Sequence, residues 1–234
     1  MAEWSATHKR RLREVWRSAG WPCKDLIELD LVAAGLLSRH WDCENRETLR
    51  VSDAGLQLLA ATRQRNQAAR SAHEELVARV AVDMQRAGRI AWRGLTLRAP
   101  LVDETGATQW VMAMPDVFSI RHTSVEDYVE PIAHEVKVSR ADLLSDLRKP
   151  TKGLAYAALA SQCWYVVRPG LATPDEIPEP FGLMEAHSDG LAVLRPAPRR
   201  PIRLAFGVWM ALAKAIPDGQ GQEIEGEQLP LPAV

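Results

Sequence analysis

The chain has 234 residues, of which 47% are hydrophobic and 25% charged, and its formal net charge is −1. These are ordinary values for a folded globular protein, and they exclude a chain that is disordered throughout. The length allows one large domain or two small ones. No run of about 18 apolar residues is present, so a membrane-spanning helix is not expected.

Two features bear on cellular location and on the use of cysteine. The sequence begins Met-Ala-Glu-Trp and shows no apolar signal core, so we expect a cytoplasmic protein. Cys23, Cys43 and Cys163 are odd in number and widely spaced. This pattern indicates neither a disulfide framework nor a structural zinc site.

The near-zero net charge hides an uneven distribution. Residues 1–70 hold twelve Lys or Arg against nine Asp or Glu, whereas residues 217–234 hold four acids and no base. A basic surface for nucleic acid is therefore compatible with the neutral total. The acidic segment 217–234 also contains several Gly and Pro residues, and we expect it to be a flexible tail.

A first domain is predicted for residues 1–65. Its expected elements are helices at 5–18 and 24–34, strands at 36–41 and 48–51, and a helix that begins at Ser52. This order, with the runs Ala34–Arg39 and Leu49–Gly55, resembles a winged-helix domain, although one helix fewer than usual precedes the wing.

The resemblance implies a DNA contact, because winged helices place a helix in the major groove and a basic wing on the backbone. Arg39, Arg46 and Arg50 on the predicted wing favour this reading. The candidate recognition helix instead carries Asp25, Glu28 and Asp30, which would repel phosphates. Contact with a protein partner, or with a second copy in a homodimer, is therefore the open alternative.

A second domain is predicted for residues 66–216, and its elements alternate between helix and strand. They are a helix at 66–87, strands at 90–98, 109–113, 117–121 and 132–138, helices at 140–148 and 151–161, a strand at 163–167, a hairpin of 181–186 with 191–194, and a helix at 204–216. Pro150 is expected to separate the two central helices. The order predicts an α/β fold.

The most informative motif is Pro115-Asp116, followed by Glu135-Val136-Lys137 on a later strand. Two carboxylates can hold Mg²⁺ through oxygen, and a bound metal ion lowers the pKa of water and neutralises charge on a phosphate. Lys137 lies two residues after Glu135, so both side chains project from the same face of the strand. This combination is typical of a metal-dependent phosphodiesterase.

The residues after Lys137 narrow the interpretation. Ser139 and Asp142 form a capping-box pattern, so Lys137 lies where a strand gives way to a helix. The run Glu135–Lys149, then Tyr156, then the aromatic-rich strand Cys163–Val167, resembles the PD-(D/E)xK nuclease superfamily, and within it the MmcB-type bacterial DNA-repair proteins. The resemblance covers roughly residues 70 to 187.

This resemblance implies a restriction-endonuclease-like mixed sheet flanked by helices, and an enzyme that hydrolyses DNA and leaves a 5′-phosphate. It implies that Asp116, Glu135 and the carbonyl of Val136 bind Mg²⁺ or Mn²⁺, and that Lys137 positions the attacking water. Such folds often place a glutamate of the first helix near the metal. Glu74 lies closer to the apolar stripe of that helix than its neighbour and is the candidate.

Simpler interpretations exist for each of these residues. Asp116 could start a turn or strand, and Glu135 with Lys137 could be an ion pair on an edge strand. The basic residues that follow the motif could clamp phosphates or be merely solvated; they are Arg140, Arg148, Lys149 and Lys152. Asp142 is expected to cap a helix and Asp146 to be solvated.

The remaining candidates are expected in the core. Tyr156 is expected to pack there, with a hydroxyl directed at the metal site as the alternative. His134 should point to the opposite face of the sheet from Glu135. The tryptophans expected to pack in the core rather than to stack on bases are Trp92, Trp110, Trp164 and Trp209.

Two rival functions stay open. One is a non-catalytic protein that binds DNA or a partner through a nuclease-like domain, and the other is a transcriptional regulator led by the winged helix. Repair, restriction and defence against mobile elements are all compatible with the sequence.

Overall fold

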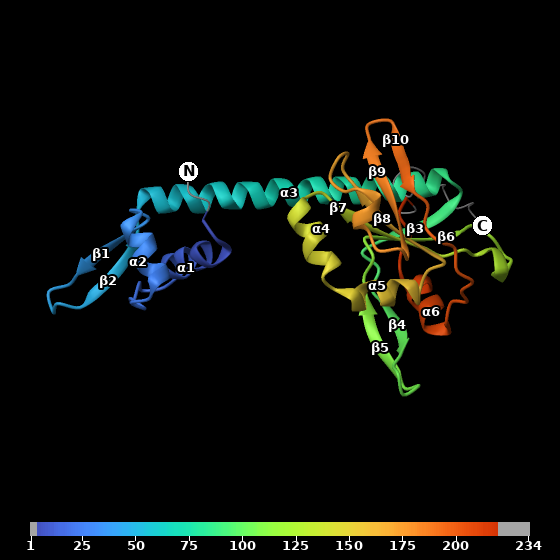
Figure 1. Cartoon of the computed structure of the whole chain (residues 1–234), viewed down its shortest axis with the longest axis horizontal. Helices are drawn as coiled ribbons and strands as arrows, with labels where there is room; N and C mark the ends of the chain where they lie inside the picture. Colours follow the sequence, from blue (N-terminus) through green and yellow to red (C-terminus); the bar gives the residue numbers. More distant parts are fainter. Residues whose placement is uncertain (1–3, 220–234) are drawn as a thin grey trace, which may run out of the picture. The chain divides into compact units, whose positions relative to one another are not determined.

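The computed structural model describes residues 4–219, and the predicted tail beyond residue 219 lies outside the described residues. The chain divides into two compact units between Arg70 and Ser71, near the boundary expected after residue 65. Helices and mixed strands alternate along the chain, which confirms the α/β class (Figure 1). None of the helices among the described residues is long and apolar enough to cross a membrane.

The first unit has the predicted order of elements. They are α1 (Ala6–Arg17), α2 (Leu26–Ala33), β1 (Leu37–Trp41), β2 (Glu47–Val51) and the beginning of α3 (Asp53–Arg86). Strands β1 and β2 form an antiparallel hairpin. Leucines from α1, α2 and both strands make a small core. Gly20 packs against this hairpin so closely that an added Cβ would lie 2.1 Å from the Leu49 carbonyl oxygen.

Helix α3 corrects one expectation. Separate helices were predicted on either side of residue 65, but α3 runs without interruption from Asp53 to Arg86. The segment between contains no proline and is rich in Ala, Arg, Gln and Glu, which are strong helix formers. The change in hydrophobic pattern near residue 65 therefore reflects different surroundings along one helix, and it does not mark a break in that helix.

The second unit holds the remaining elements. Its strands are β3 (Arg89–Arg93), β4 (Leu97–Val102), β5 (Thr108–Ala113), β6 (Val117–Arg121), β7 (Ile132–Lys137), β8 (Gln162–Val167), β9 (Phe181–His187) and β10 (Gly190–Arg195). Its helices after α3 are α4 (Arg140–Leu147), α5 (Pro150–Ala157) and α6 (Phe206–Lys214), with short 3₁₀ turns at Glu126–Tyr128 and Pro174–Glu176.

Six of these strands form one mixed sheet in the order β10-β9-β8-β7-β6-β3. Strands β7, β8 and β9 run parallel, and the other neighbours are antiparallel. The crossover from β7 to β8 consists of α4 and α5, and the predicted break at Pro150 is confirmed. The expected mixed sheet flanked by helices is therefore present.

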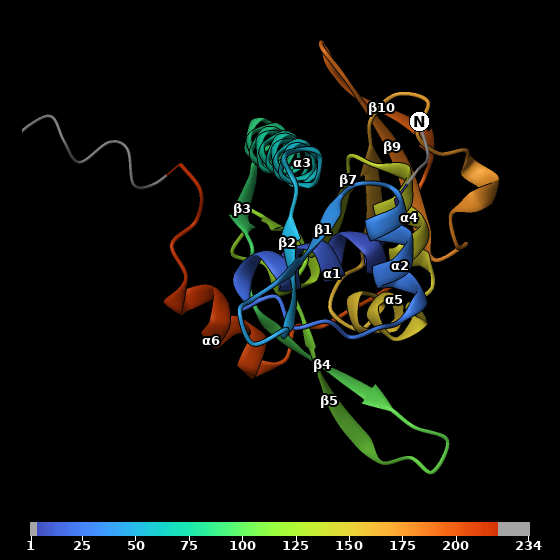
Figure 2. The ribbon, with the colours of Figure 1, turned by 90° about the vertical axis from the view of Figure 1, so that its left-hand side faces the viewer.

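One predicted strand is two. The segment expected as a single strand at 90–98 turns at Gly94, whose φ is +58°, so β3 joins the main sheet while β4 pairs with β5 in a separate hairpin. A glycine adopts such a positive φ without steric cost. Figures 1 and 2 both show this hairpin leaving the sheet, with α6 beside its base.

The two faces of the sheet have different cores. On one face, Leu76, Val77 and Val80 of α3 pack against strand residues that include Val117 and Val136. The opposite face packs against α4, α5, α6 and the inner side of the β4-β5 hairpin. Side chains alternate along β7, so Glu135 and Lys137 face α4 and α5, whereas His134 is buried on the face opposite Glu135, as predicted.

Candidate active site

Asp116 and Glu135 come together at the end of two neighbouring strands. Val117 pairs with His134 in the antiparallel register of β6 and β7, so Asp116 lies opposite Glu135. Oδ2 of Asp116 accepts a hydrogen bond of 2.7 Å from the Val136 backbone N–H. Burial, and then the charge of Glu135, raise the pKa of Asp116. The two carboxylates are therefore neighbours across these two strands.

The Val136 backbone is directed at the same place. Within a strand, the N–H and the C=O of one residue point to the same side. The Val136 N–H points to Asp116, so its carbonyl is on that side too, just beyond the last paired residue of β6. The sequence predicted that three oxygen ligands for a metal ion would lie near one another. They are grouped at this edge of the sheet, and they come from Asp116, Glu135 and the Val136 carbonyl.

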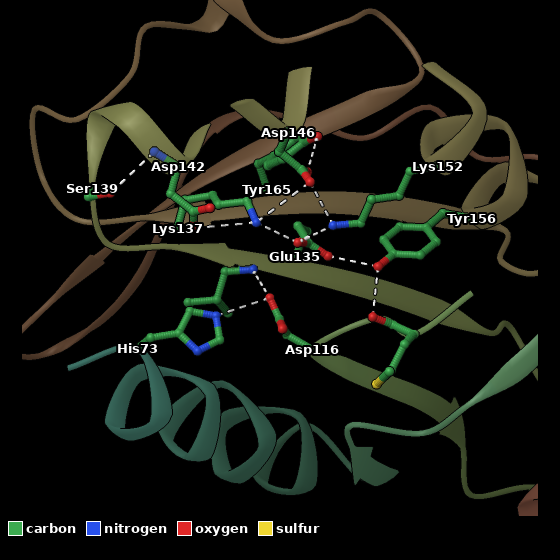
Figure 3. A network of polar contacts seen from close by, with 12 residues as sticks. His73, Asp116, Glu135, Lys137, Ser139, Asp142, Asp146, Lys152, Tyr156 and Tyr165 are labelled. Carbon is green, nitrogen blue, oxygen red and sulfur yellow. Dashed lines mark hydrogen bonds and ion pairs between the residues drawn. The ribbon is translucent and has the colours of Figure 1, made fainter. Parts of the chain in front are cut away.

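Glu135 is almost fully buried, with 3% of its surface exposed. Its Oε1 accepts from Lys137 Nζ at 2.6 Å and also from Lys152 Nζ. Its Oε2 lies 2.8 Å from the hydroxyl of Tyr156, which is also 2.9 Å from the Met114 carbonyl oxygen. Figure 3 shows three side chains converging on this carboxylate, one from β7 and two from α5. Tyr156 thus packs in the core and also points its hydroxyl at the site.

Lys137 is buried among acids, with 6% of its surface exposed. Burial lowers its pKa, but the charge and hydrogen bond of Glu135 and the charges of Asp146 and Asp142 outweigh this, so the net effect is a raised pKa. Its Nζ lies 3.7 Å from Asp142 Oδ2 and 3.8 Å from Asp146 Oδ1. The lysine is therefore held as a cation.

Asp146 differs from the expectation of a solvated residue. It is 7% exposed, and its carboxylate accepts from Lys152 Nζ at 2.8 Å and from the hydroxyl of Tyr165 at 3.0 Å. The helix turns this position inward because Leu143, one turn earlier, is also buried against the sheet. Asp142 is exposed on the first turn, and its backbone N–H donates to the N-cap Ser139 as predicted.

His73 is a candidate that sequence reasoning missed. It projects from α3 with Nε2 3.4 Å from Asp116 Oδ2 (Figure 3). It lines a cavity of about 430 Å³, which we call the carboxylate cavity. The cavity is also lined by Glu74, Arg93, Met114, Asp116 and Asp218. The spacing of His73 from the buried residues Leu76, Val77 and Val80 on α3 was the available signal.

The donor set fits a hard divalent cation in its chemistry. Mg²⁺ is usually held by one or two carboxylates and keeps several waters. Within residues 4–219, no group of three or more His, Cys, Asp or Glu side chains is placed to hold a metal ion. A cation here would therefore depend on Asp116, Glu135, the Val136 carbonyl and water, and Glu135 would have to release an ammonium partner.

The basic residues after the motif do not form one surface. Arg140 makes a two-point ion pair with Glu176, and Lys152 turns inward to Glu135 and Asp146 instead of outward to a phosphate. Arg148 and Lys149 are exposed. The expected clamp of four cations is therefore reduced to these two.

The wing of the first unit is similarly neutralised. Arg39 lies 3.4 Å from Glu47, and Arg46 pairs with Asp42 at 2.7 Å and with Glu44 at 3.1 Å. Arg50 is exposed and has no ion-pair partner among the described residues. The charge that the sequence offers to DNA is therefore largely compensated within the hairpin.

The acids of the predicted recognition helix are also engaged. Glu28 is buried and accepts from the backbone N–H groups of Cys23 and Lys24 at 2.6 and 3.1 Å. Asp25 caps α2 and pairs with Arg11 at 2.8 Å, while Asp30 lies 3.1 Å from His8. Glu28 therefore has a structural role and does not face a partner, contrary to the expectation that it would repel phosphates.

Trp110 corrects a further expectation. Trp92 and Trp164 are buried and Trp209 packs against the core, as predicted, but 53% of the Trp110 surface is exposed. It lies on the outer side of the β4-β5 hairpin, opposite Pro100. Sequence alternation could not distinguish the two faces of this hairpin because both carry apolar residues.

Comparisons with known proteins add little. No family model matches the sequence, and no curated protein matches it. Among solved structures, the chain is similar to a protein of unknown function from Silicibacter pomeroyi, with 21% identity, a TM-score of 0.37, and coverage of 57% of this chain and 75% of that one. A likeness at this level carries no argument about activity.

Proposed function

We propose that this chain is a metal-dependent deoxyribonuclease of the PD-(D/E)xK type, which cuts within DNA strands in repair or defence. The observation that carries the proposal is the convergence of Asp116, Glu135 and the Val136 backbone beside Lys137, with Asp116 lining the carboxylate cavity. Buried charge at a strand end is costly unless it is paired or used for chemistry.

In this proposal Asp116, Glu135 and the Val136 carbonyl would hold Mg²⁺ or Mn²⁺, with His73 and Glu74 at the edge of the same cavity. When bound, such an ion neutralises phosphate charge and makes a bound water more acidic. Asp116 is fixed in position by the Val136 N–H. Tyr156 and Lys152 orient Glu135 by donating to its two oxygens.

Lys137 would act on the water or the phosphate. Its raised pKa keeps the ammonium charged at neutral pH. An ammonium carries three donors. One of them is used by Glu135 Oε1 at 2.6 Å, so the group can also hydrogen-bond to an attacking water or offset charge on the scissile phosphate. The walls that bury it exclude bulk water, which strengthens these interactions.

A second candidate function is a DNA- or partner-binding domain without catalysis. The observation in its favour is that the Glu135 oxygens are already engaged by two ammonium groups and one phenol. Such a network can be purely structural. In either case the first unit would contact DNA through Arg39, Arg46 and Arg50, or contact a protein partner or a second copy.

We place the proposed activity in the cytoplasm. Cys23 and Cys43 are exposed free thiols, and Cys163 is a buried one. Exposed unpaired thiols fit a reducing compartment better than an oxidising one.

The test is cleavage of plasmid, single-stranded and branched DNA with Mg²⁺ or Mn²⁺. The wild type is compared with Asp116→Asn and Lys137→Met, and with Asp189→Asn as a control at an exposed carboxylate in the β9-β10 turn. The proposal predicts cleavage that both site variants lose and the control keeps. If all four proteins bind DNA and none of them cuts it, the result would instead favour a DNA-binding domain without catalysis.

A further inference from the structure

A second cavity of about 430 Å³ lies between the outer side of the β4-β5 hairpin and helix α6. Its walls include Arg98, Trp110 and Met112 from the hairpin, and Met210 and Lys214 from α6. We call it the hairpin groove. None of the residues discussed above for metal binding or catalysis lines it.

The groove exposes apolar side chains that a hairpin would normally cover. Trp110 is 53% exposed and Met112 is 62% exposed, whereas Leu97 and Ala99 on the inner side of β4 are buried. Side chains alternate along a strand, so Trp110 and Met112 share the outer face. Exposed apolar side chains that gather in a groove, with an aromatic ring among them, are a candidate binding surface.

The charges of the groove indicate what it binds. Arg98 and Lys214 line it, and no acidic residue among residues 4–219 does. The Arg98 guanidinium lies over the Trp110 ring, 5.7 Å from its centre. This contact still leaves 53% of the Trp110 surface exposed, so a nucleotide can place its phosphate on the cation and stack its base on the uncovered part of the ring.

Among the described residues, the groove and the carboxylate cavity share no lining residue, but the same two chain segments contribute to both. Arg93 and Gly94 line the cavity and Thr96 and Arg98 line the groove, while Trp110 and Met112 line the groove and Met114 and Asp116 line the cavity. Met114, between Trp110 and Asp116, is also exposed. The chain from Trp110 to Asp116 covers six residue steps and spans at most about 20 Å when extended. A short run of nucleotides can therefore reach from one space to the other.

We propose that the hairpin groove binds an unpaired strand of DNA and leads it to Asp116. The base faces of a duplex are stacked on one another, so only an unpaired base can stack on Trp110. Arg98 and Lys214 hold the phosphates on either side. The delivery of the strand for cutting rests on the proposed nuclease function, whereas the binding itself does not.

The experiment measures binding of the full-length protein to a labelled oligo(dT) strand and to a duplex, with EDTA present so that no cleavage intervenes. Loss of one base-stacking contact is expected to weaken strand binding by about tenfold in Trp110→Ala. Trp110→Phe keeps a ring and should retain most of the affinity. Tyr128→Ala removes an exposed aromatic residue elsewhere in the same unit and is the matched control.

The charges are tested by Arg98→Glu and Lys214→Glu, with Arg86→Glu as the control at an exposed arginine on α3. Both groove variants should weaken strand binding and reduce its salt dependence, and the control should not. A strand carrying bromodeoxyuridine should photo-cross-link to the peptide that contains Trp110 in the wild type.

Unchanged strand binding in Trp110→Ala, or an equal loss of duplex and strand binding, would overturn the proposal. A wild-type dimer that Trp110→Ala converts to a monomer, with strand binding intact, would assign the groove to a second copy instead. If the variants lose strand binding while no protein cuts DNA, the groove stands and the proposed nuclease function fails.

Discussion

Lys137 and Lys152 donate to the same oxygen, Oε1 of Glu135, although one comes from strand β7 and the other from helix α5. Lys152 also reaches Asp146, so two buried acids share two lysines, and the exposed Asp142 lies 3.7 Å from Lys137 Nζ. The second lysine is the reason that a buried glutamate and a buried aspartate can coexist on this face of the sheet.

Removing that lysine should destabilise the protein. In Lys152→Met, we expect the free energy of unfolding in urea to fall by about 1–2 kcal/mol, because two acids are left to share one cation and the lysine is only partly buried. A double-mutant cycle with Glu135→Gln should show a clear coupling energy. The exposed pair Arg39 and Glu47 is the control, with an expected coupling below about 1 kcal/mol. Additive losses at Lys152 and Glu135 would contradict the shared-oxygen arrangement.

We expect the hydroxyl of Tyr156 to contribute to stability separately from its ring, which Tyr156→Phe retains. Tyr156→Phe removes the single phenol proton, which lies within reach of both the Glu135 carboxylate and the Met114 carbonyl, so one buried acceptor loses its donor and stability should fall by about 1–2 kcal/mol. Burial and the charge of Glu135 raise the pKa of this phenol, so it donates throughout the neutral range. Thermal unfolding compares it with Tyr128→Phe at an exposed position, where a change below about 0.5 kcal/mol is expected. Equal effects would refute the role of the hydroxyl.

His134 should make the fold sensitive to acid. Burial, and then the charge of Arg89, lower its pKa from 6.5 to about 3. At pH values between these two pKa values, His134 is therefore protonated in the unfolded state and neutral in the folded state. Its contribution to stability is present above pH 6.5 and is lost as the pH falls, by up to about 1.4 kcal/mol per pH unit.

The measurement is urea unfolding between pH 7 and pH 4 (roughly the span in which an ordinary histidine and this one differ in charge). His134→Leu should flatten the decline relative to the wild type, whereas His122→Leu, at an exposed histidine, should leave it unchanged. Parallel curves for the wild type and His134→Leu would show that this histidine does not control the acid response.

We expect the buried charge of Asp116 to lower the stability of the fold, as a group kept for metal binding would. Because burial and the charge of Glu135 raise its pKa, the folded state holds the proton more tightly, and the charged form destabilises the fold as the pH rises above the unfolded value. Asp116→Asn keeps an oxygen for the Val136 N–H, so we expect it to be as stable as the wild type or more so at pH 7. Under the proposed function, it would also lose cleavage.

The same variant tests the metal. At a Mg²⁺ concentration about ten times the dissociation constant, the wild type should gain about 1.4 kcal/mol in stability, which a rise in melting temperature reports. Asp116→Asn should gain little, and Asp189→Asn should respond like the wild type. An identical Mg²⁺ response in all three proteins would remove Asp116 from any cation site.

Part of this site was readable from the sequence by itself. The period of two along a strand places Glu135 and Lys137 on one face, and Pro150 ends one helix and begins another, because both effects depend only on local backbone geometry. The α/β class also followed from the order of helical and strand patterns.

Only the tertiary structure decided the rest. His73, Asp146 and Lys152 reach the site from three different helices, and no local pattern reports how helices pack against a sheet. Trp110 faces outward because Gly94 turns β4 out of the main sheet, and an apolar residue on a strand reads the same whichever face is covered. Burial is a property of contacts between distant segments, so the composition of the site was fixed only when the segments met.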